Sequence, residues 1–166
     1  MPCLMRRRHT ARKERQGQDF KMEENNEDTK EIIRKLIYHA LAGSIVLFEG
    51  EGKMKKAVLR DAIREIRKNW KVIYVGKKHG DKWEIEELLL GSNGFFKGII
   101  FGVMPRERAL VINTPEAISS KNLDRIRYFY DENNLKSVII ATEDASIINK
   151  FPEALKNRIG NRIIKI

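Results

Sequence analysis

The sequence predicts an α/β protein with a doubly wound, parallel sheet of five strands and helices on both faces. Five short apolar segments alternate with stretches of helical periodicity, and this alternation is typical of right-handed strand–helix–strand crossovers. Four of the segments are almost continuously apolar, as expected for parallel strands that are covered on both faces. The five predicted strands are residues 45–48, 72–75, 109–112, 138–141 and 163–166.

The helices are expected from apolar residues that recur at helical spacing. Before the first strand, such residues recur at i, i+1, i+4, i+5, i+8 and i+9, which marks one face of a helix; they are Ile32, Ile33, Leu36, Ile37, Ala40 and Leu41. Asp28 or Thr29 can cap the start of this helix, and Gly43 can end it. Between the strands, similar patterns predict helices over about residues 54–68, 81–90, 94–104, 121–133 and 144–158.

Composition narrows the class of protein. The 166 residues are 42% hydrophobic and 34% charged, which suits a buried core beneath a densely charged surface. No apolar run approaches the ~18 residues of a membrane span, so a membrane partner is not expected. The single cysteine, Cys3, excludes an internal disulfide and a Cys-rich zinc site, and the three histidines are too dispersed to form a metal site. We therefore expect a cytoplasmic protein, and its few glutamines and many ionic residues are typical of thermophiles.

The net charge of +10 favours polyanionic partners, and half of it lies at the N-terminus. Residues 1–21 hold two acidic and seven basic side chains, the basic ones being Arg6, Arg7, Arg8, Arg12, Lys13, Arg15 and Lys21. An acidic stretch follows, and residues 1–28 as a whole lack apolar periodicity, so we expect a disordered tail before a folded domain over residues 29–166. The tail is either a nucleic-acid-binding arm, with Arg6, Arg7 and Arg8 as contacts, or a solvated extension.

A glycine-rich turn follows the first predicted strand, in the segment Phe48-Glu-Gly-Glu-Gly-Lys-Met54. A turn of this kind directs backbone N–H groups and a helix N-terminus at an anion, so Gly50, Gly52 and Lys53 are candidate phosphate-binding residues. The full phosphate-loop pattern is not met, because Leu47 stands where its first glycine belongs and Met54 replaces the Mg²⁺-binding hydroxyl residue. An ordinary turn beside a surface lysine is the alternative interpretation.

Three later segments strengthen the first interpretation. A Walker B strand is resembled by Ala109-Leu-Val-Ile-Asn-Thr-Pro-Glu116, with Asn113 in the aspartate position. A sensor-1 strand is resembled by Ser137-Val-Ile-Ile-Ala-Thr142. The arginine-finger stretch is resembled by Phe151-Pro-Glu-Ala-Leu-Lys-Asn-Arg-Ile159. Their order over about residues 29–166 is similar to that of AAA+ type P-loop NTPases, and among these it most resembles the clamp-loader-like members. The resemblance implies strand order 5-1-4-3-2, and the family's C-terminal helical lid is not found before Ile166.

The resemblance also implies roles for individual residues. It makes Glu116, Thr142 and Arg158 the catalytic candidates, and it adds Asn113 to the nucleotide-binding group. The expected ligand is ATP or ADP, whereas Mg²⁺ is disfavoured because Met54 and Asn113 each remove a usual ligand. In the family, the arginine finger acts on nucleotide held by a neighbouring subunit, so the expected partners are further copies of this chain or other AAA+ subunits.

The predicted helix after the turn carries a row of cations, Lys53, Lys56, Arg60, Arg64 and Arg67, opposite its apolar face. This row is either a solvated surface or a track for nucleic-acid phosphates. Taken together, the sequence predicts a degenerate AAA+-like domain with weak or no ATP hydrolysis in a DNA-associated assembly. Two alternatives stay open: a functional ATPase with an atypical phosphate loop, and a basic α/β nucleic-acid-binding module that does not use nucleotide.

Overall fold

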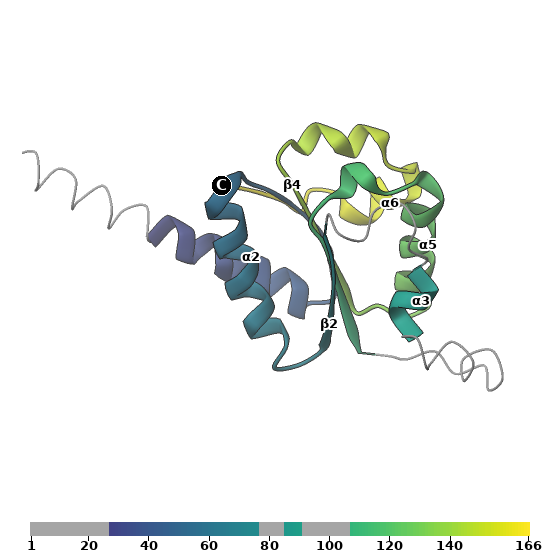
Figure 1. The fold of residues 1–166 in the computed structure, drawn as a ribbon, viewed down its shortest axis with the longest axis horizontal. Coiled ribbons are helices and arrows are strands. Elements are labelled where there is room, and N and C mark those ends of the chain that lie inside the picture. The colour runs from purple at the N-terminus through teal and green to yellow at the C-terminus, as the bar shows by residue number, and fades with distance from the viewer. Residues whose placement is uncertain (1–26, 77–84, 91–106) are drawn as a thin grey trace, which may run out of the picture.

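A single sheet of five parallel strands organises the protein (Figure 1). The computed structural model describes residues 27–76, 85–90 and 107–166. The strands lie in the order β2-β3-β4-β1-β5, which confirms the predicted fold class and the predicted order 5-1-4-3-2. Their bounds are Ile45–Glu49 for β1, Lys71–Val75 for β2, Arg108–Ile112 for β3, Ser137–Thr142 for β4 and Ile163–Lys165 for β5.

Helices connect the strands in the expected places. A leading helix covers residues 27–41, and Gly43 follows it with a φ of +74°, which favours glycine and ends the helix as predicted. The other α-helices in the described residues are α2 (Gly52–Ile66), α3 (Ile85–Leu90), α5 (Ser120–Asp131) and α6 (Glu153–Ile159). The same residues include two short 3₁₀ helices, η2 (Pro115–Ala117) and η3 (Ala145–Lys150). The predicted helix over 94–104, the start of that over 81–90 and the tail up to residue 26 lie outside the described residues.

One predicted helix is wrong. The pattern over 144–158 forms two elements, η3 and α6, with an extended Phe151 between them (φ −78°, ψ 151°). Pro152 explains the break, because proline disfavours helical backbone at the residue before it and has no N–H to donate. Proline is instead well suited to precede the first turn of α6, where N–H groups have no partner within the helix.

The sheet is the middle layer of three. Residues of each strand alternate between its faces, so Leu47 and Ile140 join a core with α3, α5 and α6, whereas Phe48 and Ile139 join a core with the leading helix and α2. Figure 1 shows these two sets of helices on opposite sides of the sheet. All six residues of β4 are buried, as expected for a central parallel strand. Within the described part of the chain, no helix has the length and apolar character needed to cross a membrane.

The centre of the sheet is expected to dominate stability. Ile139→Ala should lower the free energy of unfolding by about 2–5 kcal/mol, because the side chain is fully buried and its removal leaves a cavity. The matched control is Ile163→Ala in edge strand β5, where the side chain is 37% exposed and the loss should stay below about 1 kcal/mol. Urea denaturation of both variants measures the difference. Equal losses would contradict the core described above.

Candidate functional site

The glycine-rich turn is short and lies tightly against the sheet. Only Gly50 and Glu51 separate β1 from α2. The Gly50 N–H donates to the Thr142 carbonyl at 3.0 Å, which continues the β1–β4 pairing beyond the strands. A Cβ at Gly50 would stand 2.8 Å from Cγ2 of Ile166, so this position has no room for a side chain unless Ile166 shifts. The Gly50 N–H is therefore already bonded, and an anion at this turn would have to bind the N–H groups that follow it.

The N-terminus of α2 offers donors for such an anion. Gly52 opens the helix with a φ of +51°, and the preceding Glu51 accepts no hydrogen bond with its side chain from the first-turn N–H groups. The first turn also contains no acidic residue. Uncapped N–H groups and the helix dipole together attract negative charge at this end.

A lysine that was not predicted is the most distinctive residue beside this N-terminus. Lys55 is only 6% exposed, and its Nζ lies 3.4 Å from Oε1 of Glu143, whose side chain is 68% exposed. Lys53, the predicted phosphate-binding lysine, is instead exposed to solvent. Lys55 could have been found from the sequence, since it shares helical spacing with the buried Val58, Leu59 and Ala62 and so interrupts an apolar face.

Lys55 opens into a cavity of about 300 Å³ at the carboxyl edge of the sheet. The lining comes from the start of α2 and from the segments that follow β3 and β4. The lining residues are Gly52, Lys55, Lys56, Asn113, Thr114, Glu116 and Glu143. Ligands of open parallel sheets bind at this edge. Three residues predicted from sequence, Gly52, Asn113 and Glu116, therefore meet in one place.

Glu116 and Thr142 are also brought together. Thr142 is buried at the end of β4, and its hydroxyl lies 3.0 Å from both Oε1 of Glu116 and the carbonyl oxygen of Asp144, to either of which it can donate. The 3₁₀ turn η2 begins at Pro115 and folds Glu116 back toward β4. Glu116 lies three residues past Asn113 in the sequence, and this turn brings it back to the end of β4.

Asn113 and Met54 are engaged with other groups. The Asn113 side-chain amide donates to the hydroxyl of Tyr74 at 2.8 Å, and its Oδ1 is buried without a hydrogen-bond partner in the described structure. Met54 is 44% exposed, and its sulfur accepts a hydrogen bond from Thr29 at 3.7 Å, away from the cavity lining. Among the residues that the structure describes, no group of three or more His, Cys, Asp or Glu side chains could hold a metal ion.

A second cavity of about 690 Å³ lies between the leading helix, the turn and Ile166. Its walls include five carboxylates and two lysines, so it is an acidic environment; these charged residues are Asp28, Glu31, Lys35, Glu49, Glu51, Glu143 and Lys165. Lys165 pairs with Glu49 at 2.7 Å and, together with the N–H of Ala145, lowers the pKa of Glu49. Negative walls disfavour the phosphates of a nucleotide here, in contrast to the neighbourhood of Lys55.

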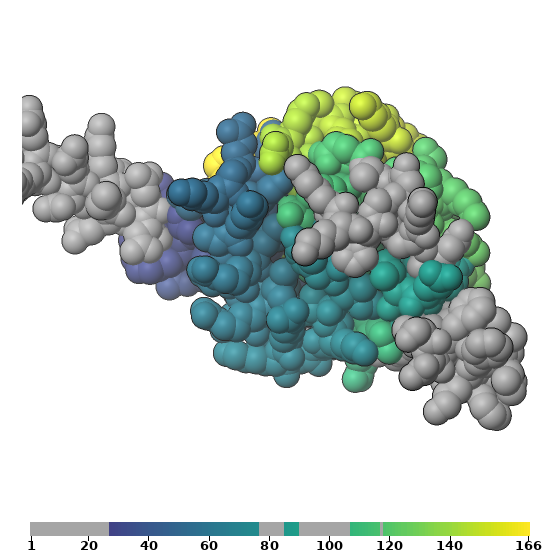
Figure 2. Space-filling view, in the orientation of Figure 1, coloured from purple at the N-terminus to yellow at the C-terminus, as the bar shows by residue number. Residues whose placement is uncertain are grey.

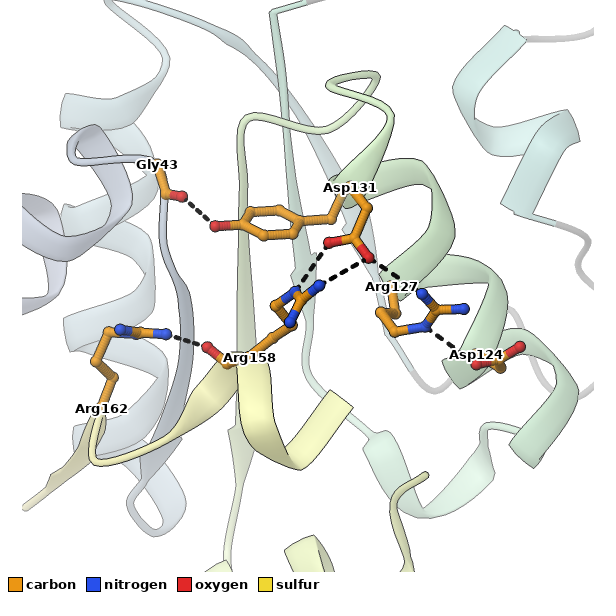
Figure 3. Close-up of polar contacts among 7 residues, drawn as sticks. Gly43, Asp124, Arg127, Asp131, Arg158 and Arg162 are labelled. Carbon is orange, nitrogen blue, oxygen red and sulfur yellow. Dashed lines mark hydrogen bonds and ion pairs between the residues drawn. The ribbon is translucent and has the colours of Figure 1, made fainter. Parts of the chain in front are cut away.

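Arg158 lies away from both cavities. Its guanidinium makes two contacts with the carboxylate of Asp131, at 2.9 and 3.2 Å, and Arg127 donates to the same carboxylate at 3.1 Å (Figure 3). The hydrogen bond and charge of Arg158 lower the pKa of Asp131, and Asp131 in turn raises the pKa of Arg158. α5 and α6 both end at the edge where β4 and β5 begin, opposite the carboxyl edge that holds Lys55.

The predicted nucleic-acid contacts divide into two groups. Lys56, Arg60 and Arg64 on α2 and Arg67 at its C-cap are all exposed, as their spacing predicted. Arg6, Arg7 and Arg8 fall in the part of the tail outside the described residues. Of the two groups, only the first can be related to the cavity, because Lys56 is also one of its lining residues.

Comparison with known proteins supports the fold. No family model matches the sequence, and no curated protein matches it. The crystal structure of Cdc6p from Pyrobaculum aerophilum aligns with a TM-score of 0.53 and 13% identity, over 73% of this chain and 38% of that one. A chain in the structure of Drosophila ORC bound to GC-rich DNA and Cdc6 aligns with a TM-score of 0.56 and 12% identity, over 86% of this chain and 58% of that one.

These likenesses bear on the fold alone. The chain spans 38% of the Cdc6p chain and 58% of the chain in the ORC structure. Together with the parallel sheet in the order 5-1-4-3-2, they show that residues of this chain form the α/β core fold of AAA+ ATPases.

The pair between Asp131 and Arg158 predicts a pH-dependent contribution to stability. Because the pKa of Asp131 is lowered in the folded state, the pair stabilises the fold above the unfolded pKa of about 3.9 and ceases to do so as the pH falls through the lower folded value. Asp131→Asn should therefore lower the melting temperature at pH 7, by about 2–4 °C or less for an exposed pair, and should have a smaller effect near pH 2. Asp124→Asn, which removes a single contact with Arg127, is the control and should shift the temperature less. Identical shifts at both pH values would contradict the role given to the pair.

Proposed function

We propose that this protein is a degenerate AAA+-like domain that binds the phosphates of ATP or ADP, hydrolyses them slowly or not at all, and acts as a subunit or regulator in a DNA-associated assembly. The observation that carries the proposal is Lys55. A lysine that is 6% exposed and faces a cavity beside an uncapped helix N-terminus is suited to bind an anion from solution.

The partner that Lys55 has now is easily displaced. Glu143 approaches it at 3.4 Å, longer than a strong charge-assisted hydrogen bond, and the Glu143 side chain is 68% exposed. A phosphate oxygen bound at the N-terminus of α2 would replace this carboxylate and accept hydrogen bonds from Lys55 and the first-turn N–H groups together. Lys56 adds a second positive charge at the rim of the cavity. The residues present therefore fit a phosphate group.

Hydrolysis is disfavoured because the two positions expected to hold Mg²⁺, residues 54 and 113, do not supply its usual oxygen ligands. Mg²⁺ neutralises charge on the transferred phosphoryl group when it is bound in proteins of this fold. Met54 is directed toward Thr29, and the Asn113 side-chain amide is held by Tyr74, so neither offers the hydroxyl or carboxylate oxygen that this ion prefers. Glu116 and Glu143 are the carboxylates of the cavity lining, and Glu116 is held in place by its contact with Thr142. Among the residues that the structure describes, they are not joined by a third side chain that could complete a metal site, which supports binding better than turnover.

The proposed role in a DNA-associated assembly is supported by two observations. Two of the structures to which this chain is similar are described as Cdc6p and as ORC bound to GC-rich DNA and Cdc6. The chain also carries a net charge of +10, which favours association with polyanions. Arg158 is the residue proposed to act on nucleotide bound by a neighbouring subunit, which requires that its pair with Asp131 open on assembly.

Lys55 and Lys53 offer a matched test of nucleotide binding. Lys55→Met keeps most of the side-chain volume and removes the charge, and it should weaken ADP binding by about 10- to 100-fold, the cost of one charge-assisted hydrogen bond. Lys53→Met removes an exposed charge two residues away and should change the affinity by no more than about twofold. Isothermal titration calorimetry with ADP, with and without Mg²⁺, measures both. Equal affinities would contradict the assignment of Lys55, and no binding by the wild type would favour the nucleic-acid module that does not use nucleotide.

Turnover separates the proposal from the rival in which the chain is a working ATPase. The arrangement of Glu116 with Thr142 is the observation that favours the rival. We expect phosphate release to stay near background for the wild type and for Glu116→Gln alike. Steady turnover that Glu116→Gln abolishes would overturn the proposed lack of hydrolysis while leaving nucleotide binding intact.

A further inference from the structure

The outer face of α2 carries an unbroken row of positive charge. Five cations recur at steps of three, four, four and three residues, and all of them are exposed: Lys53, Lys56, Arg60, Arg64 and Arg67. On an α-helix these steps place the five within an arc of about 80° and along about 21 Å of the axis. α2 forms one outer layer of the fold in Figure 1, and its side chains lie on the near face in Figure 2.

The row is only partly neutralised by its neighbours. Asp61 lies 3.0 Å from Arg60, and the contacts of Arg64 with Asp61 and Glu65 are both at 4.0 Å, the limit of an ion pair. Within the described ranges, no ion pair involves Lys53, Lys56 or Arg67. The face therefore keeps a surplus of positive charge, and the pairs it does contain are weak surface pairs.

The shape of the row favours a linear polyanion over a membrane. The apolar side of α2, including Val58, Ala62 and Ile66, is buried in the core, so the helix has no apolar face to insert into lipid. A duplex carries about one phosphate per 3.4 Å on each strand, so 21 Å of its axis presents about six phosphates per strand to five cations.

We infer that the outer face of α2 is a docking surface for the sugar–phosphate backbone of duplex DNA, and that it shares Lys56 with the phosphate cavity, so that DNA and nucleotide weaken each other's binding. The coupling between DNA and nucleotide rests on the proposed function. Lys56 belongs to the exposed row and also lines the cavity beside Lys55. Because a coupling free energy is reciprocal, DNA lowers the affinity for ADP by the factor by which ADP lowers the affinity for DNA.

The docking surface is tested without nucleotide. Binding of the full chain to a duplex of about 20 bp is followed by fluorescence anisotropy between 50 and 200 mM salt, because the slope of log affinity against log salt counts phosphate contacts. Replacing Arg60, Arg64 and Arg67 together by Gln should reduce the steepness of that slope by about 2.7. Between 50 and 200 mM salt, the wild type should therefore lose about 40-fold more affinity than the triple variant.

A charge-matched control replaces Lys121, Lys150 and Lys156 by Gln, on α5, η3 and α6 at the far side of the sheet. Its slope should stay within about 0.9 of the wild type, the value of one contact. Equal slopes for the two triple variants would overturn the docking surface. So would equally tight binding of the wild type to anionic phosphatidylserine vesicles with the same dependence on the α2 row.

The coupling through Lys56 is tested by repeating the DNA titration with saturating ADP. In the wild type, ADP should reduce the steepness of the salt slope by about 0.9. The slope of Lys56→Gln should already be less steep by about 0.9 without ADP, and ADP should not change it further. No effect of ADP on the wild type, in the presence of ADP binding measured directly, would overturn the coupling alone. Failure of ADP to bind at all would overturn the proposed function and the coupling, and the docking surface would still be judged by its own titration.

Discussion

The pairing of β1 with β4 is the constraint on which the site depends. The two strands run in parallel from Ile45 opposite Val138 to Glu49 opposite Thr142, although about 90 residues of chain separate them. The Gly50 N–H then bonds to the Thr142 carbonyl, so the turn after β1 and the segment after β4 leave the sheet side by side. This register brings Lys55, carried by the helix after one strand, within reach of Glu143, carried by the loop after the other.

The short connection after β1 sets the helical phase of α2. With two residues between strand and helix, α2 begins at Gly52 and turns Lys55 toward the sheet, together with Leu59 and Ala62. The same phase turns Lys53 and Lys56 outward. A connection longer by one residue would rotate every side chain of the helix by about 100° about its axis, and it would change which lysine faces the sheet and which face solvent. One local feature therefore determines both which lysine enters the cavity and which cations form the outer row.

The fold could be predicted further from the sequence than the site. Apolar runs mark parallel strands because both faces of such strands are buried, and the strand order followed from the resemblance of ordered motifs. The break at Phe151 was missed because a helical pattern of apolar residues continues across it, although Pro152 was a visible signal. Lys55 was missed because a motif comparison directs attention to the lysine next to a glycine, whereas burial depends on helical phase. The pairing of Arg158 with Asp131 joins residues 27 apart on different helices, and no local pattern encodes such a contact.

The pair between Arg158 and Asp131 is compatible with a role for Arg158 in an assembly. Arg158 is about half exposed, and exposed pairs contribute little to stability, because solvent competes for both charges. Opening the pair thus costs little compared with the free energy of a specific protein interface, which is about −8 kcal/mol for micromolar affinity. Asp131 would also keep a cationic partner in Arg127 after the pair opens. The intramolecular contact holds Arg158 in a defined orientation in the isolated chain, and its weakness leaves the guanidinium available to the phosphate of a neighbouring subunit that the proposed function requires.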